Sequence, residues 1–247
     1  MGQYITSRQN SRIQQLRKLL RSKKEREQAG LFVADGTKLL AEAVRWWPGL
    51  ETVFLTDGVQ ADVPDTVEVI RVSPEIMEYV SPMESPQGAL FVCRLPEQSS
   101  YEPVPGLLLD GIQDPGNLGT ILRTADALQI PVTLLEGCAD PYSHKVVRAS
   151  MGAVFRTPVI QSRWVAVKEA CANANIPVAV TALSDRAEDI RNADLGKMAV
   201  VIGSEGQGVR PEIMADAQRQ LIIPMNPNCE SLNAAVAATI VMWQMKL

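Results

Sequence analysis

The second half of the chain alternates short apolar strands with helices, and this alternation constrains the fold more than any other feature. We predict strands at Leu107–Asp110, Val132–Leu135, Val154–Ile160, Pro177–Leu183, Met198–Ile202 and Leu221–Ile223. Helices are predicted near Asn117–Leu128, Trp164–Asn173 and Ser231–Lys246. Strands that are apolar throughout need cover on both faces, so the pattern predicts an α/β fold with a mostly parallel sheet. In such sheets ligands bind beyond the carboxyl ends of the strands.

Residues 1–95 predict a smaller α/β domain. It begins with an amphipathic helix, Ser11–Arg26, whose apolar face carries Ile13 and Leu16. The predicted strands are Leu31–Ala34, Thr52–Leu55, Val67–Val72 and Gly88–Leu95, and the other helices are Gly36–Trp47 and Ser73–Val80. Residues 96–105 contain three prolines and no periodicity, which is typical of a linker. The second domain therefore covers residues 106–247.

Several classes of protein are excluded by composition. The longest apolar run, Ala234–Trp243, is about half the length of roughly 18–20 residues that a membrane span needs. The N-terminus has no apolar core of a signal peptide, so we expect a cytoplasmic protein without a membrane segment. The chain has one histidine, His144, and four scattered cysteines, so we expect no metal site and no disulfide framework.

The charge of the chain is unevenly distributed. The net charge is −4, yet residues 1–26 carry +7 and the remainder −11. A basic segment of this kind favours contact with phosphates, while a solvated helix face without a partner stays the alternative. The candidate phosphate-binding side chains are Arg8, Arg12, Arg17, Lys18, Arg21, Lys23 and Lys24.

The first of three unusual loops, Asp110–Arg123, follows a strand and enters a helix. Its glycines allow tight turning and close approach of a ligand. Asn117 and Leu118 stand where a Walker A loop has lysine and serine or threonine, and the spacing of a dinucleotide-binding GxGxxG is absent. A nucleotide-dependent enzyme is therefore disfavoured, although a structural turn stays possible.

The other two loops are also rich in ligand-binding groups. Gly203–Gly208 follows a strand and places Glu205 at the tip of a glycine-rich turn. In Ile223–Ala238, Ser231 is a candidate N-cap and Asn233 lies in the first helical turn. Taken singly, the loops are also consistent with an ordinary turn and an ordinary helix cap.

In their order and spacing the three loops resemble the motifs of the SpoU/TrmH family of RNA ribose 2′-O-methyltransferases. Asn117–Arg123 is similar to N-x-G-x-x-x-R, Gly203–Gly208 to G-[SN]-E-x-x-G, and Ile223–Ala238 to the terminal motif. Val147–Ala153 also resembles a family segment. Residues 1–95 are similar to the substrate-binding domain of many members, with Asp35 where glutamate is more usual.

The resemblance implies a deep trefoil knot in the second domain and a homodimer with the active site at its interface. It also implies S-adenosylmethionine as the cofactor, bound in the cleft of the knot. The residues expected to contact the cofactor are Gly203, Ile223, Leu232, Thr181, Ala182, Gly208 and Met225.

The resemblance assigns catalytic roles as well. Arg123 matches the catalytic arginine of the family. Because a guanidinium keeps its proton, we expect positioning and charge stabilisation, and base catalysis stays the alternative. Asn117 would orient Arg123 or the ribose. The remaining pocket residues would be Glu205, Ser231 and Asn233.

Arg148 is a candidate contact to a phosphate or to the target nucleotide. His144 is expected to be a surface residue.

The resulting hypothesis is methyl transfer to a ribose 2′-hydroxyl in RNA, with ribosomal RNA favoured. The basic N-terminal segment would then hold RNA through its phosphates. The alternatives are a transfer-RNA 2′-O-methyltransferase, a non-catalytic RNA-binding protein on the same scaffold, and a nucleotide-dependent enzyme that uses the glycine loops.

Overall fold

The structure is a computed structural model that describes residues 4–97, 101–226 and 228–247, and it divides into two compact units. Unit 1 contains the described residues up to Glu97 together with Asp140–Arg156, and unit 2 contains the rest. The sequence placed residues 140–156 in the second domain, whereas they pack within unit 1. Residues 98–100 of the predicted linker lie outside the described residues.

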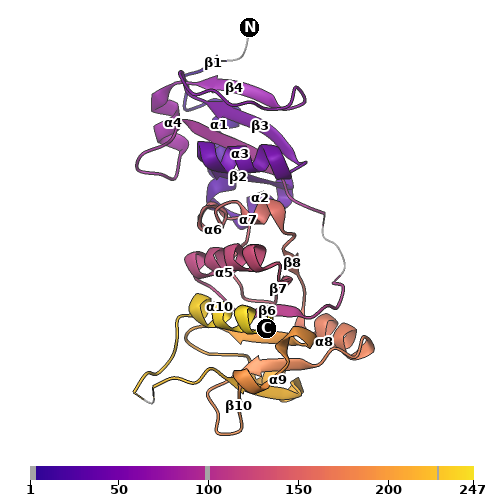
Figure 1. Cartoon of the computed structure of the whole chain (residues 1–247). Helices are drawn as coiled ribbons and strands as arrows, with labels where there is room; N and C mark the ends of the chain where they lie inside the picture. The colour runs from indigo at the N-terminus through magenta and orange to yellow at the C-terminus, as the bar shows by residue number, and fades with distance from the viewer. Residues whose placement is uncertain (1–3, 98–100, 227) are drawn as a thin grey trace. The chain divides into compact units, whose positions relative to one another are not determined.

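Unit 1 is built on a five-stranded mixed sheet (Figure 1). Its strands are β1 (Tyr4–Ile5), β2 (Leu31–Asp35), β3 (Leu50–Leu55), β4 (Glu68–Val72) and β5 (Ala89–Arg94). They lie in the order β1-β4-β3-β5-β2. β4 pairs in parallel with β1 and β3, and β5 pairs antiparallel with β2 and β3. The predicted strands are confirmed; β1 was missed because two residues carry no readable pattern.

Helices cover both faces of this sheet because successive strand residues point to opposite sides. Val33 packs in a core with α1 (Ser11–Arg21) and α4 (Pro74–Val80). The neighbouring Phe32 points the other way, toward an aromatic cluster. Its ring lies 5.7 Å from that of Trp47, 5.1 Å from that of Tyr142 and 6.3 Å from that of Phe155. Tyr142 and Phe155 thus hold residues 140–156 in unit 1.

The remaining helices of unit 1 follow from local signals. They are α2 (Lys23–Ala29), α3 (Thr37–Trp46), α6 (His144–Ala149) and α7 (Ala153–Arg156). The single helix predicted over Ser11–Arg26 is wrong, because Ser22 is extended and separates α1 from α2. The Ser22 side chain accepts a hydrogen bond from the Glu25 amide and so caps α2.

Unit 2 contains a seven-stranded sheet in which every neighbouring pair is parallel, which confirms the predicted sheet. The strand order is β10-β12-β9-β11-β6-β7-β8. The strands are β6 (Gly106–Asp110), β7 (Val132–Leu134), β8 (Ile160–Gln161), β9 (Val178–Thr181), β10 (Glu188–Asp189), β11 (Ala199–Gly203) and β12 (Arg219–Ile222). The strand predicted over Val154–Ile160 is wrong, because its first half is α7. A short apolar run does not distinguish a strand from a buried helix.

The helices of unit 2 place the motif loops. They are α5 (Pro115–Leu128), α8 (Trp164–Asn173), α9 (Pro211–Asp216) and α10 (Ala234–Gln244), with 3₁₀ turns at Ile190–Asn192 and Leu195–Lys197. α10 packs against α5 and β11, and Figure 1 shows α10 beside α5. Within the described residues, none of the helices is long and apolar enough to cross a membrane.

Candidate active site

The three motif loops meet at Asn117. Its side-chain amide donates a hydrogen bond to the Glu205 carboxylate in the loop after β11. Its side-chain oxygen accepts a hydrogen bond of 3.0 Å from Asn233 at the start of α10. Segments that are far apart in sequence are therefore joined through a single side chain.

Helix capping holds Asn117 and Asn233 in place. Asp114 caps α5 by accepting a 2.7 Å hydrogen bond from the Asn117 amide, and Pro115 occupies the first turn. Asn233 caps α10 and accepts from the amides of Ala235 and Val236 at 2.9 and 3.3 Å. The N-cap predicted at Ser231 is wrong, because the helix begins only at Ala234.

The loop that carries Glu205 closes on itself. The amide of Ser204 donates to the carbonyl oxygen of Gly208 at 3.1 Å, and the Gly208 amide returns a 3.0 Å bond to Ser204. A Cβ at position 203 would lie 2.1 Å from the Gly208 carbonyl carbon, so only glycine fits there. The predicted contact residue Gly203 thus also makes the turn possible.

An ion pair between a buried aspartate and a partly buried arginine fixes the strand ends beneath these loops. Asp110, the last residue of β6, is 1% exposed. It accepts from the Arg210 backbone amide at 2.8 Å and from Arg210 Nε at 2.6 Å. Arg210 also donates to Glu136, after β7, at 2.9 Å. Arg210 lies in none of the motif loops and was not predicted from the sequence, although an aspartate that ends an apolar strand signals a buried partner.

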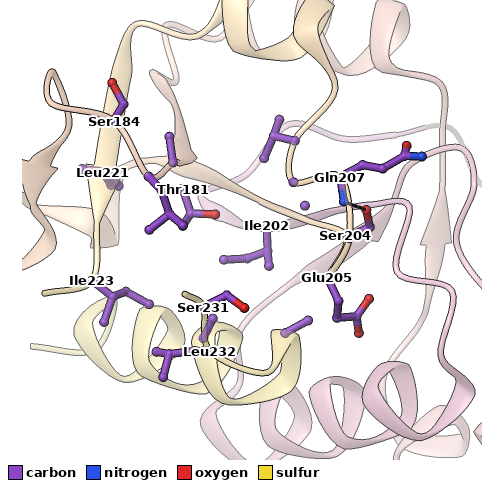
Figure 2. A pocket seen from close by; sticks show the side chains of 18 of the residues that line it. Thr181, Ser184, Ile202, Ser204, Glu205, Gln207, Leu221, Ile223, Ser231 and Leu232 are labelled. Carbon is purple, nitrogen blue, oxygen red and sulfur yellow. Dashed lines mark hydrogen bonds between the residues drawn. The ribbon is translucent and has the colours of Figure 1, made fainter. Parts of the chain in front are cut away.

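A cavity of about 680 Å³ opens beside the motif loops. Figure 2 shows Thr181 and Ile202 facing Ser231 and Leu232 across it. Every residue predicted to contact the cofactor lines this cavity: Thr181, Ala182, Gly203, Gly208, Ile223, Met225 and Leu232. Lining residues that the sequence analysis did not single out include Ser184, Gln207 and Gln220. Neither their spacing nor their type marked them in advance.

The charge of the cavity lining discriminates between ligands. Of the described residues that line it, Glu205 and Glu230 carry charge, and none is a lysine or arginine. A ligand with a positive centre is favoured beside two carboxylates, whereas a polyphosphate has no cation to neutralise it. The lining therefore fits a sulfonium ligand and counts against a nucleotide-dependent enzyme.

Arg123 lies on α5, beyond Asn117, and its side chain is exposed. In the described part of the chain its guanidinium makes no hydrogen bond or ion pair with another residue. Arg123 is also absent from the cavity lining, which separates it from the predicted cofactor residues. The guanidinium is thus accessible to a substrate.

The predicted RNA-binding residues lie in unit 1. Arg8 and Arg17 lie over the Tyr79 ring at 4.6 and 4.1 Å. Arg12 forms an ion pair with Glu68. Lys23 pairs with Glu27 at 3.6 Å, and Lys18, Arg21 and Lys24 are exposed. Arg148, at the end of α6, contacts the sulfur of Met83.

His144 is half-buried rather than a surface residue, which corrects the expectation from its loop-like sequence context. It begins α6, and its Nδ1 is buried without a hydrogen-bond partner among the described residues. Burial lowers the pKa of His144, and the nearby cations Lys145, Arg26 and Arg148 act in the same direction, while a backbone hydrogen bond at Leu20 opposes them.

Comparisons with known proteins match both units. Residues 106–243 match the SpoU rRNA Methylase family, and residues 10–90 match the MRM3-like substrate binding domain. The chain is 30% identical to the 23S rRNA (guanosine(2553)-2′-O)-methyltransferase RlmP of Bacillus subtilis, covering 98% of each protein. It is also 30% identical to a 23S rRNA (uridine(2479)-2′-O)-methyltransferase of Streptomyces viridochromogenes, covering 97% of this chain and 90% of that protein.

The fold is matched by a solved structure as well. The AdoMet-bound rRNA methyltransferase from Sinorhizobium meliloti superposes with a TM-score of 0.86 at 26% identity, covering 99% of this chain and 97% of that one. These similarities extend over both units, so they are not restricted to the motif loops.

Proposed function

The chain belongs to the SpoU rRNA methylase family, and on this premise we infer that it transfers a methyl group from S-adenosylmethionine to a ribose 2′-hydroxyl of ribosomal RNA. The observation that carries this inference is the convergence of Asn117, Glu205 and Asn233 beside a cavity of suitable size and charge. The similarity to named ribosomal RNA enzymes over almost the whole chain favours ribosomal over transfer RNA.

The cofactor fits the cavity in unit 2. Its volume of about 680 Å³ lies within the usual range for small-molecule sites. Ile223, Met225 and Leu232 offer apolar contacts, and Glu205 and Glu230 offer negative charge to a cationic ligand. When bound, S-adenosylmethionine supplies a methyl group that is already electrophilic because it is attached to a sulfonium.

The acceptor side of the reaction needs a group that stabilises the ribose oxygen as it loses its proton. We assign this role to Arg123, because its guanidinium is exposed and makes no ion pair with the described residues. Asn117 is fixed by two side-chain hydrogen bonds and supports the position of the acceptor. Ser231 lines the cavity and completes the proposed pocket.

We further propose that unit 2 contains a deep trefoil knot and assembles as a homodimer. The strand order supports the knot, since β11 lies between β6 and β9 and the chain then returns to pack α10 against α5. Exposed apolar side chains on α10 support the dimer: Val236 is 48% and Trp243 59% exposed. Light scattering of the purified protein tests the dimer, and a mass equal to one chain contradicts it.

The reaction is tested by transfer of labelled methyl from S-adenosylmethionine to unmodified ribosomal and transfer RNA, followed by alkaline hydrolysis. A 2′-O-methyl group protects the adjoining phosphodiester, so we expect label in alkali-resistant dinucleotides from ribosomal RNA. Label in mononucleotides would show methylation of a base instead. Label in transfer RNA alone would show that the substrate is transfer RNA and not ribosomal RNA.

The variant Arg123→Ala separates catalysis from cofactor binding in the same assay. We expect turnover to fall by at least about 100-fold, because the group that stabilises the ribose oxygen is lost. Cofactor affinity measured by calorimetry should be retained, because Arg123 does not line the cavity. Unchanged methyl transfer would remove Arg123 from the mechanism.

A further inference from the structure

A second cavity, of about 490 Å³, lies wholly within unit 1. It is lined by the end of β2, the start of α3, the segment before β5 and the end of α6. Its polar, charged and thioether lining side chains include Asp35, Lys38, Met83, Gln87, Arg148 and Met151. None of them belongs to the cofactor cavity in unit 2.

Among the described residues, Asp35 and Gln87 each leave one polar atom at this cavity without a hydrogen-bond partner. Asp35 Oδ2 accepts a 2.6 Å hydrogen bond from Ser81, and among the described residues Oδ1 has no partner. Gln87 Oε1 accepts from the Thr37 amide at 3.2 Å, which holds the Gln87 side chain in place. In the same part of the chain its amide nitrogen has no partner, so it is available as a donor.

Asp35 is only partly exposed, and its burial raises the pKa of its carboxyl group, while the hydrogen bond from Ser81 and the charge of Arg148 lower it. A carboxylate that has lost part of its water gains most from new N–H donors. The unpaired Oδ1 is therefore a strong site for a ligand that presents such donors.

The rest of the lining suits a flat, phosphate-bearing ligand. Met83 and Met151 provide flexible thioether side chains, which pack well against aromatic rings. Lys38 and Arg148 are exposed cations at the same cavity. The nearby carboxylate of Glu42 is already neutralised by its ion pair with Arg156, so it does not repel a phosphate.

We propose that this cavity binds an unpaired guanine nucleotide of the RNA substrate. Guanine presents N1–H and N2–H donors for Asp35 next to the O6 acceptor for the amide of Gln87, an arrangement that no other standard base has. Lys38 and Arg148 would contact the phosphate. The proposal rests on the proposed function, because it takes the nucleotide to be part of the ribosomal RNA that unit 2 methylates.

The test uses the full chain with ¹³C-labelled methionine methyl groups and NMR titration with GMP, AMP, CMP, UMP and ribose 5-phosphate. Met83→Leu and Met151→Leu assign the two signals of this cavity. We expect GMP to shift both signals, and to do so at least tenfold more tightly than the other nucleotides. S-adenosylmethionine is titrated in parallel and should shift Met214 and Met225, which line the other cavity.

Two variants test the proposed contacts of Asp35 and Gln87 with guanine. Asp35→Asn keeps an oxygen for Ser81 but replaces an acceptor by a donor, and Gln87→Glu keeps the oxygen for Thr37 but removes the donor. Each should weaken GMP at least tenfold and leave the shifts caused by S-adenosylmethionine unchanged. Gln87 is exposed, so its variant should fold even if Asp35→Asn does not.

The outcomes separate this proposal from the function of unit 2. Equal shifts with every nucleotide, shifts with ribose 5-phosphate alone, or no shift with about 10 mM GMP would overturn the guanine site. A normal response of Met225 in those experiments would leave the methyltransferase assignment standing. Failure of S-adenosylmethionine to shift Met225, with a normal response of Met83 to GMP, would have the opposite meaning.

Discussion

The side-chain amide of Asn233 donates a 3.0 Å hydrogen bond to the side-chain oxygen of Asn117, although 116 residues separate them. The amide of Asn117 in turn donates to Glu205. Both polar ends of Asn117 are therefore in use, and its orientation is fixed by residues from the other two motif loops. The loops act as one unit because of this side chain.

Replacing Asn117 by aspartate should break one of its two side-chain hydrogen bonds while keeping a side chain of the same size at this position. The new carboxylate would still accept from Asn233, but its second oxygen would face the Glu205 carboxylate and repel it. We expect kcat to fall by about 100-fold, because a displaced acceptor loses alignment. The KM for S-adenosylmethionine should rise as well, because the repelled Glu205 lines the cofactor cavity.

A matched control for this variant is Asn173→Asp, an exposed position at the end of α8. Its steady-state kinetics should equal those of the wild type. An Asn117→Asp enzyme with unchanged kcat would show that the hydrogen bonds through Asn117 are structural only.

The sequence predicted which loops matter, but it did not predict how they are joined. The pattern around Asn117, Glu205 and Asn233 identified each residue singly. Their hydrogen bonds depend on the strand order, which places β11 beside β6, and local periodicity carries no information on that order. The Ser231 cap was wrong for a related reason, because both residues are good caps and packing of α10 selects Asn233.

The Asp110–Arg210 pair should contribute strongly to stability. Asp110→Asn leaves the partly buried guanidinium of Arg210 with a weaker partner, and breaking a fully buried pair costs about 3–5 kcal/mol. Because Arg210 is about a third exposed, we expect a smaller loss of about 2–3 kcal/mol in the free energy of unfolding. Urea denaturation measures it.

The exposed pair of Lys197 and Asp194 provides the comparison. Its side chains are 82% and 59% exposed, so Asp194→Asn should change the free energy of unfolding by less than about 0.5 kcal/mol. If Asp110→Asn behaves like this surface variant, the pair does not hold the strand ends together.

Unit 1 includes residues 140–156, which its sequence pattern did not indicate. Residues 140–156 follow β7 in the chain and lie beyond the linker predicted at residues 96–105, so they were expected in the second domain. Tyr142 and Phe155 instead complete the aromatic cluster around Phe32, and Asp140 forms a buried ion pair with Arg26 at 2.5 Å. Contacts of this sequence separation leave no periodic signal.

His144 should make the stability of the protein depend on pH. Burial lowers its pKa below the ordinary value of 6.5, so the unfolded chain binds the proton more readily than the folded protein. The stability that the neutral imidazole provides is present above about pH 6.5 and is lost as the pH falls through the lower value of the folded state. The free energy of unfolding should therefore fall more steeply between pH 7 and 5 in the wild type than in His144→Gln. Parallel curves for the two proteins would show that His144 titrates normally.

The basic side chains on α1 and α2 can be tested for RNA binding only by variants that leave the core of unit 1 intact. Deleting residues 1–26 would remove Ile13, Leu16 and Leu19 from the core of unit 1, so loss of RNA binding by that truncation would have no clear cause. The exposed side chains Lys18, Arg21 and Lys24 can be changed to glutamine without disturbing that core.

We expect the triple variant to bind ribosomal RNA more weakly and with a shallower salt dependence. Each lost phosphate contact lowers the slope of log affinity against log salt by about 0.7–0.9, so three contacts lower it by about 2–3. Filter binding over a series of KCl concentrations measures the slope. The control variant replaces Arg163, Arg186 and Lys246, which are exposed in unit 2, by glutamine. If both triple variants keep the wild-type slope, the basic side chains of α1 and α2 form a solvated helix face, and phosphate recognition must come from elsewhere in the chain.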